Sequence, residues 1–353
     1  MEESDLNIIK KPFETDEDFE TKAVRPKKFS DFIGQSFVTN NLNIFVKAAK
    51  QRREESSTNS NKENIALDHI LLHGPPGLGK TTLASIIANE MSVGIKVASG
   101  PMFMKTGDLV AILTNLQSYE VLFIDEIHRM PIAVEEILYS AMEDYCVDIV
   151  VGSGPAARTV KINLNPFTLI GATTRTGMLS NPLRSRFGIL LQMQFYNQQE
   201  LMQIAIRGAR NLANIELKAQ YAILIAKRSR GTPRITLRLL RRVMDFALIN
   251  NNNIVDEHII NQAMESMGID KYGLDVADIK YLKIIKDNYG GGPVGIETIA
   301  AALSEDRGTI EETIEPFLLQ EGFLERTSRG RVITSKAVDY LESQVAIIIN
   351  HNN

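Results

Sequence analysis

The 353-residue sequence predicts an α/β fold: a parallel-sheet domain, then a small all-helical domain, then a block of helices that ends in a hairpin. Three patterns indicate this order. Short apolar runs alternate with helical patterns over residues 69–195, and only helical periodicity is present over 196–267. Residues 323–334, FLERTSRGRVIT, have the pattern of a hairpin whose polar tip contains glycine. Unbroken apolar strands separated by helices are typical of a parallel sheet that is covered on both faces.

The N-terminal segment 1–23 is expected to be an acidic, disordered tail. Its first 20 residues hold eight carboxylate side chains against Lys10 and Lys11, a net charge of −6. The whole chain has a formal net charge of −4, so the remainder is mildly basic at +2. A segment of high net charge and low hydrophobicity cannot bury enough apolar surface to fold. We therefore expect the folded body to begin near Val24.

Four apolar runs are the expected strands of the sheet domain: ILLH at 70–73, VLFID at 121–125, FTLIGA at 167–172 and ILLQMQF at 189–195. The polar stretch 51–64, QRREESSTNSNKEN, precedes the first strand and predicts an inserted surface loop. Helical periodicity is clearest in two later segments, 198–213 and 235–249.

Cysteine content and hydropathy indicate the cellular compartment in which the protein is found. The single cysteine, Cys146, excludes an intrachain disulfide, which fits a reducing compartment. No apolar run approaches the about 18–20 residues that span a bilayer. The N-terminus also lacks the basic-then-apolar order of a secretory signal. We expect a cytoplasmic protein with no membrane partner.

Residues 74–81, GPPGLGKT, match the phosphate-binding pattern G-x-x-x-x-G-K-[ST] without a mismatch. An apolar run precedes the motif and the helix-compatible TTLASIIANEM follows it, which is the context that the motif requires. Glycines let successive backbone N–H groups point at phosphate oxygens, and the helix start adds partial positive charge. We expect Lys80 to bind the β- and γ-phosphates of ATP and the hydroxyl of Thr81 to ligate Mg²⁺.

Asp125 and Glu126 stand at the end of the apolar run 121–125. Carboxylates at the carboxyl end of a buried parallel strand lie where open α/β sheets bind ligands. We expect Asp125 to hold Mg²⁺ through water and Glu126 to orient and polarise the attacking water. Thr173 and Thr174 end the next apolar run, where a hydroxyl could contact the γ-phosphate. The sequence does not decide between them, and a turn cap is an equal alternative.

Two arginines follow these motifs. Arg186 comes after the strands of the nucleotide site, and Arg234 lies in the first turn of a helix that Thr232 can cap and Pro233 can start. An arginine in a first turn opposes the helix dipole, and a bound triphosphate would favour it there. An ordinary surface ion pair remains the alternative for either arginine.

The motifs GPPGLGKTT, LFIDEIHR, GATTRTGMLSNPLRSRFG and RGTPRI resemble those of the AAA+ ATPases. With AMEDY, GPAARTV and FLERTSRGR, the set is similar to the RuvB family of bacterial branch-migration motors. The resemblance runs from about Val24 to Leu341. Single motifs occur in many AAA+ proteins, whereas the whole set in this order is specific.

This resemblance implies an ATP hydrolase that drives branch migration of Holliday junctions. The motor would be a homohexameric ring around double-stranded DNA, recruited by RuvA and working with the resolvase RuvC. It also implies three domains: an AAA+ ATPase domain at 24–195, a helical lid domain at 196–267 and a winged-helix domain at 268–353.

Matched motif by motif, the resemblance assigns ATP binding to Val24, Arg25, Gly77, Gly79, Lys80, Thr81, Thr82, Glu143, Asp144, Tyr145, Arg186, Tyr196 and Arg234. Arg186 corresponds to the arginine finger, which completes the site of the neighbouring subunit, and Arg184 is its rival. Such a finger can contribute about 10³–10⁵ in rate.

The segment 146–162 matches a projecting β-hairpin that docks on RuvA. From the residues alone, its alternation indicates only an edge hairpin. The apolar Val147, Ile149 and Val151 would then be exposed and would need a covering surface.

The C-terminal domain has two candidate DNA elements. Residues 309–320 form the helix that a winged-helix domain normally places in the major groove, but phosphates would repel its row of carboxylates: Glu311, Glu312 and Glu315. The resemblance assigns DNA binding instead to Arg326 and Arg331 of the following hairpin, with Arg329 as a helper. Phosphate contacts carry no sequence information, which suits a motor that moves along any DNA. A solvated charge cluster is the alternative.

Other DNA-transaction ATPases share such a core. A clamp loader or a replication initiator is the first alternative. The finger motif Arg-Phe-Gly in place of Arg-Cys and the lack of zinc-spaced cysteines argue against a clamp loader. An initiator would end in a sequence-reading helix-turn-helix. An ATP-gated transcriptional regulator that binds DNA without translocating is the second alternative.

Overall fold

The computed structural model describes residues 25–58, 66–151, 158–250 and 253–351. The acidic tail, Val24 and residues 59–64 of the predicted insertion lie outside them. The chain divides into two compact units: Met1–Gly74, Leu78–Tyr196 and Arg207–Glu216 in one, and Pro75–Gly77, Asn197–Ile206 and Leu217–Asn353 in the other. In the described part of the chain, every helix is too short or too polar to cross a membrane.

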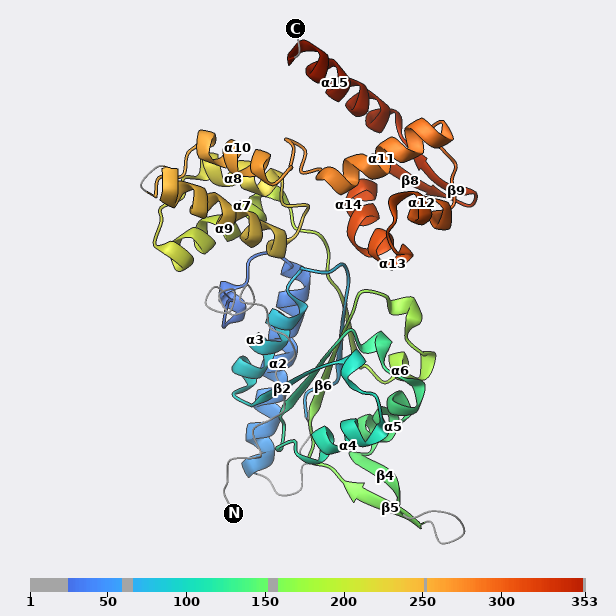
Figure 1. Ribbon diagram of the computed structural model, residues 1–353. Coiled ribbons are helices and arrows are strands. Elements are labelled where there is room, and N and C mark those ends of the chain that lie inside the picture. Colours follow the sequence, from blue (N-terminus) through green and yellow to red (C-terminus); the bar gives the residue numbers. More distant parts are fainter. Residues whose placement is uncertain (1–24, 59–65, 152–157, 251–252, 352–353) are drawn as a thin grey trace, which may run out of the picture. The chain divides into compact units, whose positions relative to one another are not determined.

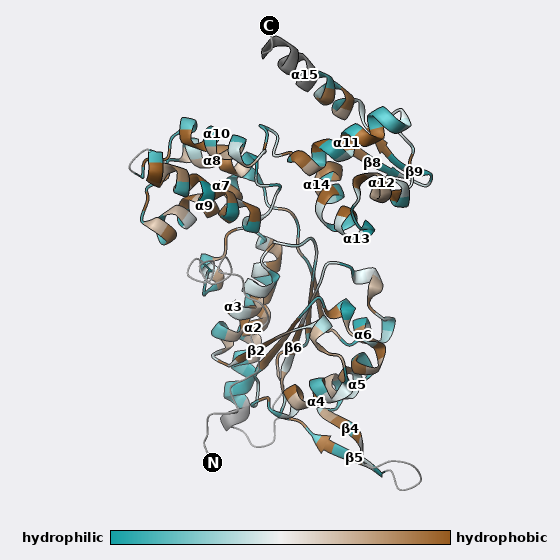
Figure 2. Cartoon of the chain, viewed as in Figure 1, coloured by the Kyte–Doolittle hydropathy of each residue, from teal (hydrophilic) through white to brown (hydrophobic). Residues whose placement is uncertain are grey.

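The first unit contains the predicted parallel sheet, which has five strands instead of the four that the sequence indicated. Its strand order is β2(Ile95–Ser99), β3(Val121–Asp125), β6(Thr168–Thr173), β1(Ile70–His73), β7(Ile189–Gln192). β3 and β6 are buried almost throughout because helices cover both faces, which explains their unbroken apolar runs. The hydrophobic colouring of these strands is visible in Figure 2.

Helices pack on both faces of this sheet: α2(Ser36–Thr58) and α3(Lys80–Met91) on one, and α4(Thr106–Thr114), α5(Ile132–Glu143) and α6(Asn181–Ser185) on the other (Figure 1). A hairpin of β4(Cys146–Val151) and β5(Arg158–Asn163) follows α5. The loop prediction for 51–64 is wrong at its start, because α2 continues to Thr58. Gln51 donates a side-chain hydrogen bond of 3.2 Å to Glu55, one helical turn on, which supports the helix there.

The second unit begins with the predicted helical segment. Its helices are α7(Gln198–Ala213), α8(Ala219–Lys227), α9(Pro233–Asn250) and α10(Glu257–Ser266), and the last part of α7 belongs to the first unit. The start of α9 is as expected, since the Thr232 hydroxyl accepts the backbone N–H of Ile235 at 3.4 Å.

The C-terminal block has its own core. It contains α11(Val276–Tyr289), α12(Ile296–Leu303), α13(Arg307–Thr309), the π-helical turn η6(Ile310–Ile314), α14(Glu315–Gln320), β8(Leu324–Thr327), β9(Gly330–Ile333) and α15(Ser335–His351). β8 and β9 pair antiparallel with Thr327 opposite Gly330, so Ser328 and Arg329 form a two-residue turn. This is the predicted hairpin.

Candidate functional site

The P-loop joins β1 to α3, and its glycines hold backbone positions that other residues would strain. Gly74 has φ 142°, and a Cβ there would lie 2.5 Å from the carbonyl oxygen of Met193. Gly79, φ 100°, is the left-handed residue directly before α3. The buried Lys80 follows, and its Nζ donates a 2.8 Å hydrogen bond to the carbonyl of Gly74. A close-packed glycine loop at a helix start is an anion-binding arrangement.

Both predicted carboxylates lie at the carboxyl end of β3. Asp125 is the last residue of this strand, and its Oδ1 accepts the backbone N–H of Glu126 at 3.0 Å. Glu126 has φ 47°, a left-handed conformation that is uncommon outside functional or tight turns. Because β1 and β3 run parallel, their carboxyl ends share one edge of the sheet. The structure therefore brings the P-loop and the acidic pair to the same edge, as predicted.

The two candidate threonines differ in their surroundings. Thr174 donates from Oγ1 to Oε2 of Glu126 at 3.3 Å. Thr173 is fully buried, and its Oγ1 lies 2.9 Å from Nδ1 of His128. The same histidine nitrogen is 3.3 Å from Oε2 of Glu126. Of the two threonines, it is thus Thr174 that contacts the carboxylate of Glu126 directly. The geometry also reveals His128, which sequence reasoning missed because its spacing from Glu126 has no distinctive pattern.

Arg186 lies near the opposite edge of the sheet. Its Nη2 is 3.1 Å from Oε2 of Glu143, and its guanidinium carbon is 4.5 Å from the centroid of the Tyr139 ring. Met142 is next to Glu143 in the chain, and its carbonyl oxygen lies 3.1 Å from Nε2 of His69. His69 directly precedes β1. A strand advances about 3.3 Å per residue, so β1 separates this group from the P-loop by roughly 13 Å.

Arg184 acts at a different place. The pKa of His73, the last residue of β1, is lowered by burial and then by the positive charges of Arg184 and Lys80. The charge of Arg184 therefore acts at the P-loop end of β1, whereas Arg186 forms its ion pair near the other end.

Tyr145 and the exposed Asp144 also lie at the amino edge. The Tyr145 ring is 6.5 Å from the His69 ring and 5.9 Å from the Phe167 ring. Burial raises the pKa of Tyr145 and lowers that of His69. Nδ1 of His69 accepts the backbone N–H of Leu169 at 2.9 Å, so this ring is held neutral and has a structural task.

Two other predicted ATP-binding residues, Tyr196 and Arg234, form hydrogen bonds with single residues of the P-loop. The Tyr196 hydroxyl donates to the carbonyl of Leu78 at 3.0 Å, and the backbone N–H of Arg234 donates to the carbonyl of Gly77 at 3.3 Å. Thr82 is in the first turn of α3. Arg25 is half-buried at the start of the described chain, and Val24 lies outside it.

Two oxygen donors at this edge suit Mg²⁺: the hydroxyl of Thr81 and the carboxylate of Asp125. Among the described residues, no three or more His, Cys, Asp or Glu side chains are grouped so that they could hold a metal by themselves. Mg²⁺ is usually bound by one or two protein oxygens together with phosphates and water. The donor set therefore fits an ion that arrives with a nucleotide.

Family models match three consecutive parts of the chain. The Holliday junction DNA helicase RuvB P-loop domain matches residues 24–193, the RuvB AAA lid domain 196–270 and the RuvB C-terminal winged helix domain 271–342. The chain belongs to the RuvB family. It is therefore an ATP-hydrolysing P-loop enzyme that binds nucleotide, with the predicted AAA+, lid and winged-helix folds. Because all three parts match RuvB, the clamp-loader, initiator and regulator alternatives lose their support.

Relatives and solved structures agree with this family. The Holliday junction branch migration complex subunit RuvB of Orientia tsutsugamushi (strain Boryong) is 57% identical over 319 residues, which are 90% of this chain and 94% of that relative. The subunit of the same name from Rhodospirillum centenum is 54% identical over 319 residues, 90% and 85% of the two chains. The structure of the Thermotoga maritima RuvB Holliday junction branch migration motor superimposes with a TM-score of 0.80 at 48% identity, covering 91% of this chain and 98% of that one.

The β4–β5 hairpin of this RuvB-family chain is anchored at its base. Val147 is 1% exposed and belongs to the core of the sheet unit, so the prediction that it would be exposed is wrong. The reason is that β4 begins directly after α5 and packs beneath it. Ile149 is half-buried, the side chain of Val151 is not described, and residues 152–157 lie outside the described chain.

Glu315 was expected in the row of carboxylates that would keep residues 309–320 away from DNA, but it is not part of an exposed row. Glu315 is fully buried and accepts hydrogen bonds of 2.8 Å from the Tyr281 hydroxyl, Nε of Arg326 and Nε of Arg331. Burial raises the pKa of Glu315, but the bonds from Arg331, Tyr281 and Arg326 outweigh it and leave the pKa below its ordinary value. Of the three predicted DNA contacts, Arg331 is the least accessible, with 14% of its side chain exposed against 45% for Arg326. Arg329 is exposed in the turn.

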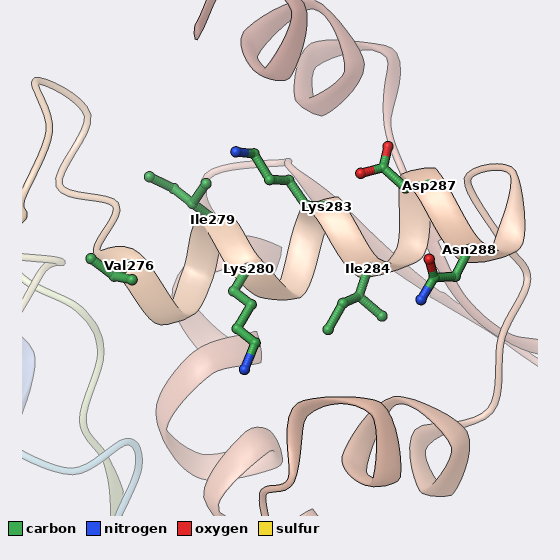
Figure 3. A pocket seen from close by; sticks show the side chains of 7 residues that line it. All are labelled: Val276, Ile279, Lys280, Lys283, Ile284, Asp287 and Asn288. Carbon is green, nitrogen blue, oxygen red and sulfur yellow. The ribbon is translucent and has the colours of Figure 1, made fainter. Parts of the chain in front are cut away.

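A shallow pocket of about 380 Å³ lies along α11 (Figure 3). It is lined by Val276, Ile279, Lys280, Lys283, Ile284, Asp287 and Asn288. None of these residues belongs to the P-loop, to the acidic pair or to the wing arginines. The pocket is therefore separate from the nucleotide site.

Proposed function

We propose that this protein is the ATP-driven motor of Holliday junction branch migration and that it works as a homohexameric ring on double-stranded DNA. One observation carries the proposal: a P-loop site with a positioned Glu126 precedes a RuvB lid domain and a RuvB winged-helix domain in one chain. The relatives named above are branch-migration subunits, which supports the same task here.

The chemistry is transfer of the γ-phosphoryl group of ATP to water. Lys80 neutralises charge on the phosphates, and Glu126 orients the water and accepts its proton. Thr174 holds the Glu126 carboxylate by the 3.3 Å hydrogen bond and contacts the γ-phosphate. Thr81 and Asp125 would hold Mg²⁺, which supplies further charge neutralisation when bound.

Arg186 serves the site of a neighbouring subunit. Its position near the amino edge of the sheet, paired with Glu143, separates it from the P-loop of its own chain by the length of β1. Glu143, Asp144 and Tyr145 lie on the same edge and are proposed as companions of this contact.

The partners follow from the domains. The β4–β5 hairpin is the proposed docking element for RuvA, and the wing with Arg326, Arg329 and Arg331 is the proposed DNA contact. RuvC as a further partner rests on the family resemblance alone. Since the substrate is cellular DNA, we place the protein in the cytoplasm.

A synthetic four-way junction tests this function. Purified protein with RuvA, ATP and Mg²⁺ should convert the junction into its duplex products, and Glu126→Gln should bind the junction without converting it. Junction that stays intact with the wild-type protein and RuvA would contradict the motor function. ATP hydrolysis that DNA stimulates without any junction movement would instead indicate a DNA-bound ATPase that does not translocate.

A further inference from the structure

Three arginines with different partners lie in the turn between α8 and α9 and at the start of α9. Arg234 contacts the P-loop, since its backbone N–H donates to the carbonyl of Gly77 at 3.3 Å. Arg228 and Arg230, on the other side of the turn, hold the segment that leads into α11. Arg228 Nε donates to the carbonyl of Asp270 at 3.2 Å, and Arg230 Nε donates to the carbonyl of Gly273 at 3.0 Å. A single short turn thus touches a nucleotide-binding loop and the start of the winged-helix domain.

Arg230 also forms a buried ion-pair cluster with the start of α11. Its Nη2 lies 2.6 Å from Oδ2 of Asp278 and 2.7 Å from Oδ2 of Asp275, with 10% of the Arg230 side chain and none of the Asp278 side chain exposed. The two aspartates form the capping box of α11. Burial raises the pKa of Asp278 to about 7 although Arg230 lowers it. Buried ion pairs of this kind add little net stability, and orientation is the better-supported use for them.

The backbone around Arg230 packs closely against the backbone of the segment that leads into α11. Arg230 has φ 51° and Gly231 φ 68°, two consecutive left-handed residues. Gly273 has φ 84°, and a Cβ on it would lie 3.1 Å from the Cα of Arg228. The two segments therefore approach at backbone distance, and the Ser229 hydroxyl anchors the turn to the carbonyl of Ile225 at 2.7 Å.

From Asp278 the contacts continue to the wing. Tyr281, one helical turn further along α11, donates to the buried Glu315 of α14. Glu315 in turn binds Arg326 and Arg331, the proposed DNA contacts. The Arg230 guanidinium also lies over the Phe317 ring of α14, 5.0 Å from its centroid. The contacts of Arg230 with α11 and α14, and those of Tyr281 and Glu315 on the same two helices, thus connect the Arg234 turn to the wing.

We infer that Arg230 is a positioning residue that couples the Arg234 turn to the winged-helix domain, so that nucleotide state and DNA engagement influence each other. This inference rests on the proposed DNA-motor function. Coupling between two sites is reciprocal. DNA bound at the wing should therefore change ATP turnover through Arg230, while turnover without DNA should not depend on it.

The test compares ATP hydrolysis with and without linear duplex DNA in three full-length variants. Arg230→Ala removes the cluster, and Asp278→Asn removes the carboxylate charge while keeping an acceptor for the N–H of Asp275. Arg242→Ala is the matched control, because it removes an arginine of the same domain whose partner Asp245 is exposed on α9. Without DNA, kcat and KM for ATP should stay within about twofold of the wild-type values in all three variants. Stimulation by DNA should fall about fivefold or more in Arg230→Ala and Asp278→Asn, and stay unchanged in Arg242→Ala.

Three results would overturn the inference. If DNA stimulates Arg230→Ala as much as Arg242→Ala, Arg230 does not couple the Arg234 turn to the winged-helix domain. An equal loss of turnover with and without DNA would assign Arg230 to hydrolysis itself. A wild-type protein whose turnover ignores DNA would refute the motor function and this coupling together. If Arg230→Ala does not fold, Arg230→Lys decides, because an ammonium group keeps the charge but cannot bind the Gly273 carbonyl and both carboxylates at once.

Discussion

The groups at the carboxyl edge of the sheet have distinct tasks that their individual contacts explain. Lys80 is a buried ammonium group at the base of a loop of backbone N–H groups, so it adds a full charge where phosphates bind. Glu126 is instead held by Thr174 and His128 in a left-handed turn, which fixes its carboxylate relative to the strand end. The proposed mechanism therefore assigns ATP binding and ATP hydrolysis to different side chains.

Lys80→Ala and Glu126→Gln should accordingly fail in different ways. Lys80→Ala removes charge-assisted hydrogen bonds worth about 1.5–3 kcal/mol, so ATP should bind about 10- to 150-fold more weakly. Glu126→Gln keeps an acceptor for Thr174 but cannot take a proton, so ATP binding should stay within about twofold while hydrolysis falls about 10²-fold or more. Titration with a fluorescent ATP analogue and single-turnover hydrolysis measure the two effects. Wild-type affinity in Lys80→Ala would remove Lys80 from the site.

Glu315 gives a prediction about pH. Its pKa is lowered in the folded protein, so its stabilising contribution is fully present above the unfolded value of 4.5 and is lost as the pH falls through the folded value. At about pH 7, Glu315→Gln should destabilise the wing by roughly 3 kcal/mol, because two arginines lose their buried partner. As the pH falls below the unfolded value of 4.5 and through the lower folded value, this difference should shrink. Hydrogen exchange of the β8–β9 amides in the full chain measures it, and a difference that does not change with pH would contradict the role of the charge.

At the scale of elements, burial decides what the sequence could predict. β3 and β6 are apolar runs because both of their faces are covered, and they were predicted. β2 was missed because Lys96 interrupts the apolar run of this short edge strand, which is only partly buried, with Val97 54% exposed. The segment 51–64 was predicted as a loop because it is rich in Ser and Asn. Its first five residues, QRREE, are good helix formers, and α2 continues through them to Thr58. Local composition alone did not show how far the helix extends.

Site residues divide in the same way. Motifs of contiguous residues, such as the P-loop and the acidic pair, were predictable because the backbone itself places them. Partners that meet only through tertiary packing were not. The contact of His128 with Thr173 joins residues 45 positions apart, and Glu315 meets Tyr281 across 34 positions. No local pattern contains such contacts.

The β4–β5 hairpin should have a structural base and a binding surface further out. Val147→Ser should cost about 2–3 kcal/mol, because the side chain is part of the core. Ile149→Ser, at a half-buried position of the same strand, should change stability by less than about 1 kcal/mol but weaken RuvA binding. Thermal unfolding and calorimetric titration with RuvA separate the two effects. Unchanged RuvA affinity in Ile149→Ser, with the fold intact, would place the docking surface elsewhere.

At the scale of the whole molecule, the groups to which the proposed mechanism assigns hydrolysis are divided between two edges of one sheet. Lys80, Glu126 and Thr174 lie at the carboxyl edge, while Arg186 and Glu143 lie near the amino edge. One chain cannot fold its own finger onto its own phosphate without crossing the length of β1. Under the proposed function, a complete site needs the amino edge of a second subunit, which would make hydrolysis dependent on assembly.

Mixing two inactive variants tests this division most directly. Lys80→Ala subunits keep Arg186 but cannot bind ATP productively, and Arg186→Ala subunits keep an intact P-loop site. Each variant alone should be nearly inactive, whereas mixed rings should hydrolyse ATP with a maximum near equal proportions. The double variant Lys80→Ala/Arg186→Ala, mixed with Arg186→Ala, should restore nothing. Absence of activity at every ratio, with mixed rings shown by native mass spectrometry, would contradict the account and turn attention to Arg184.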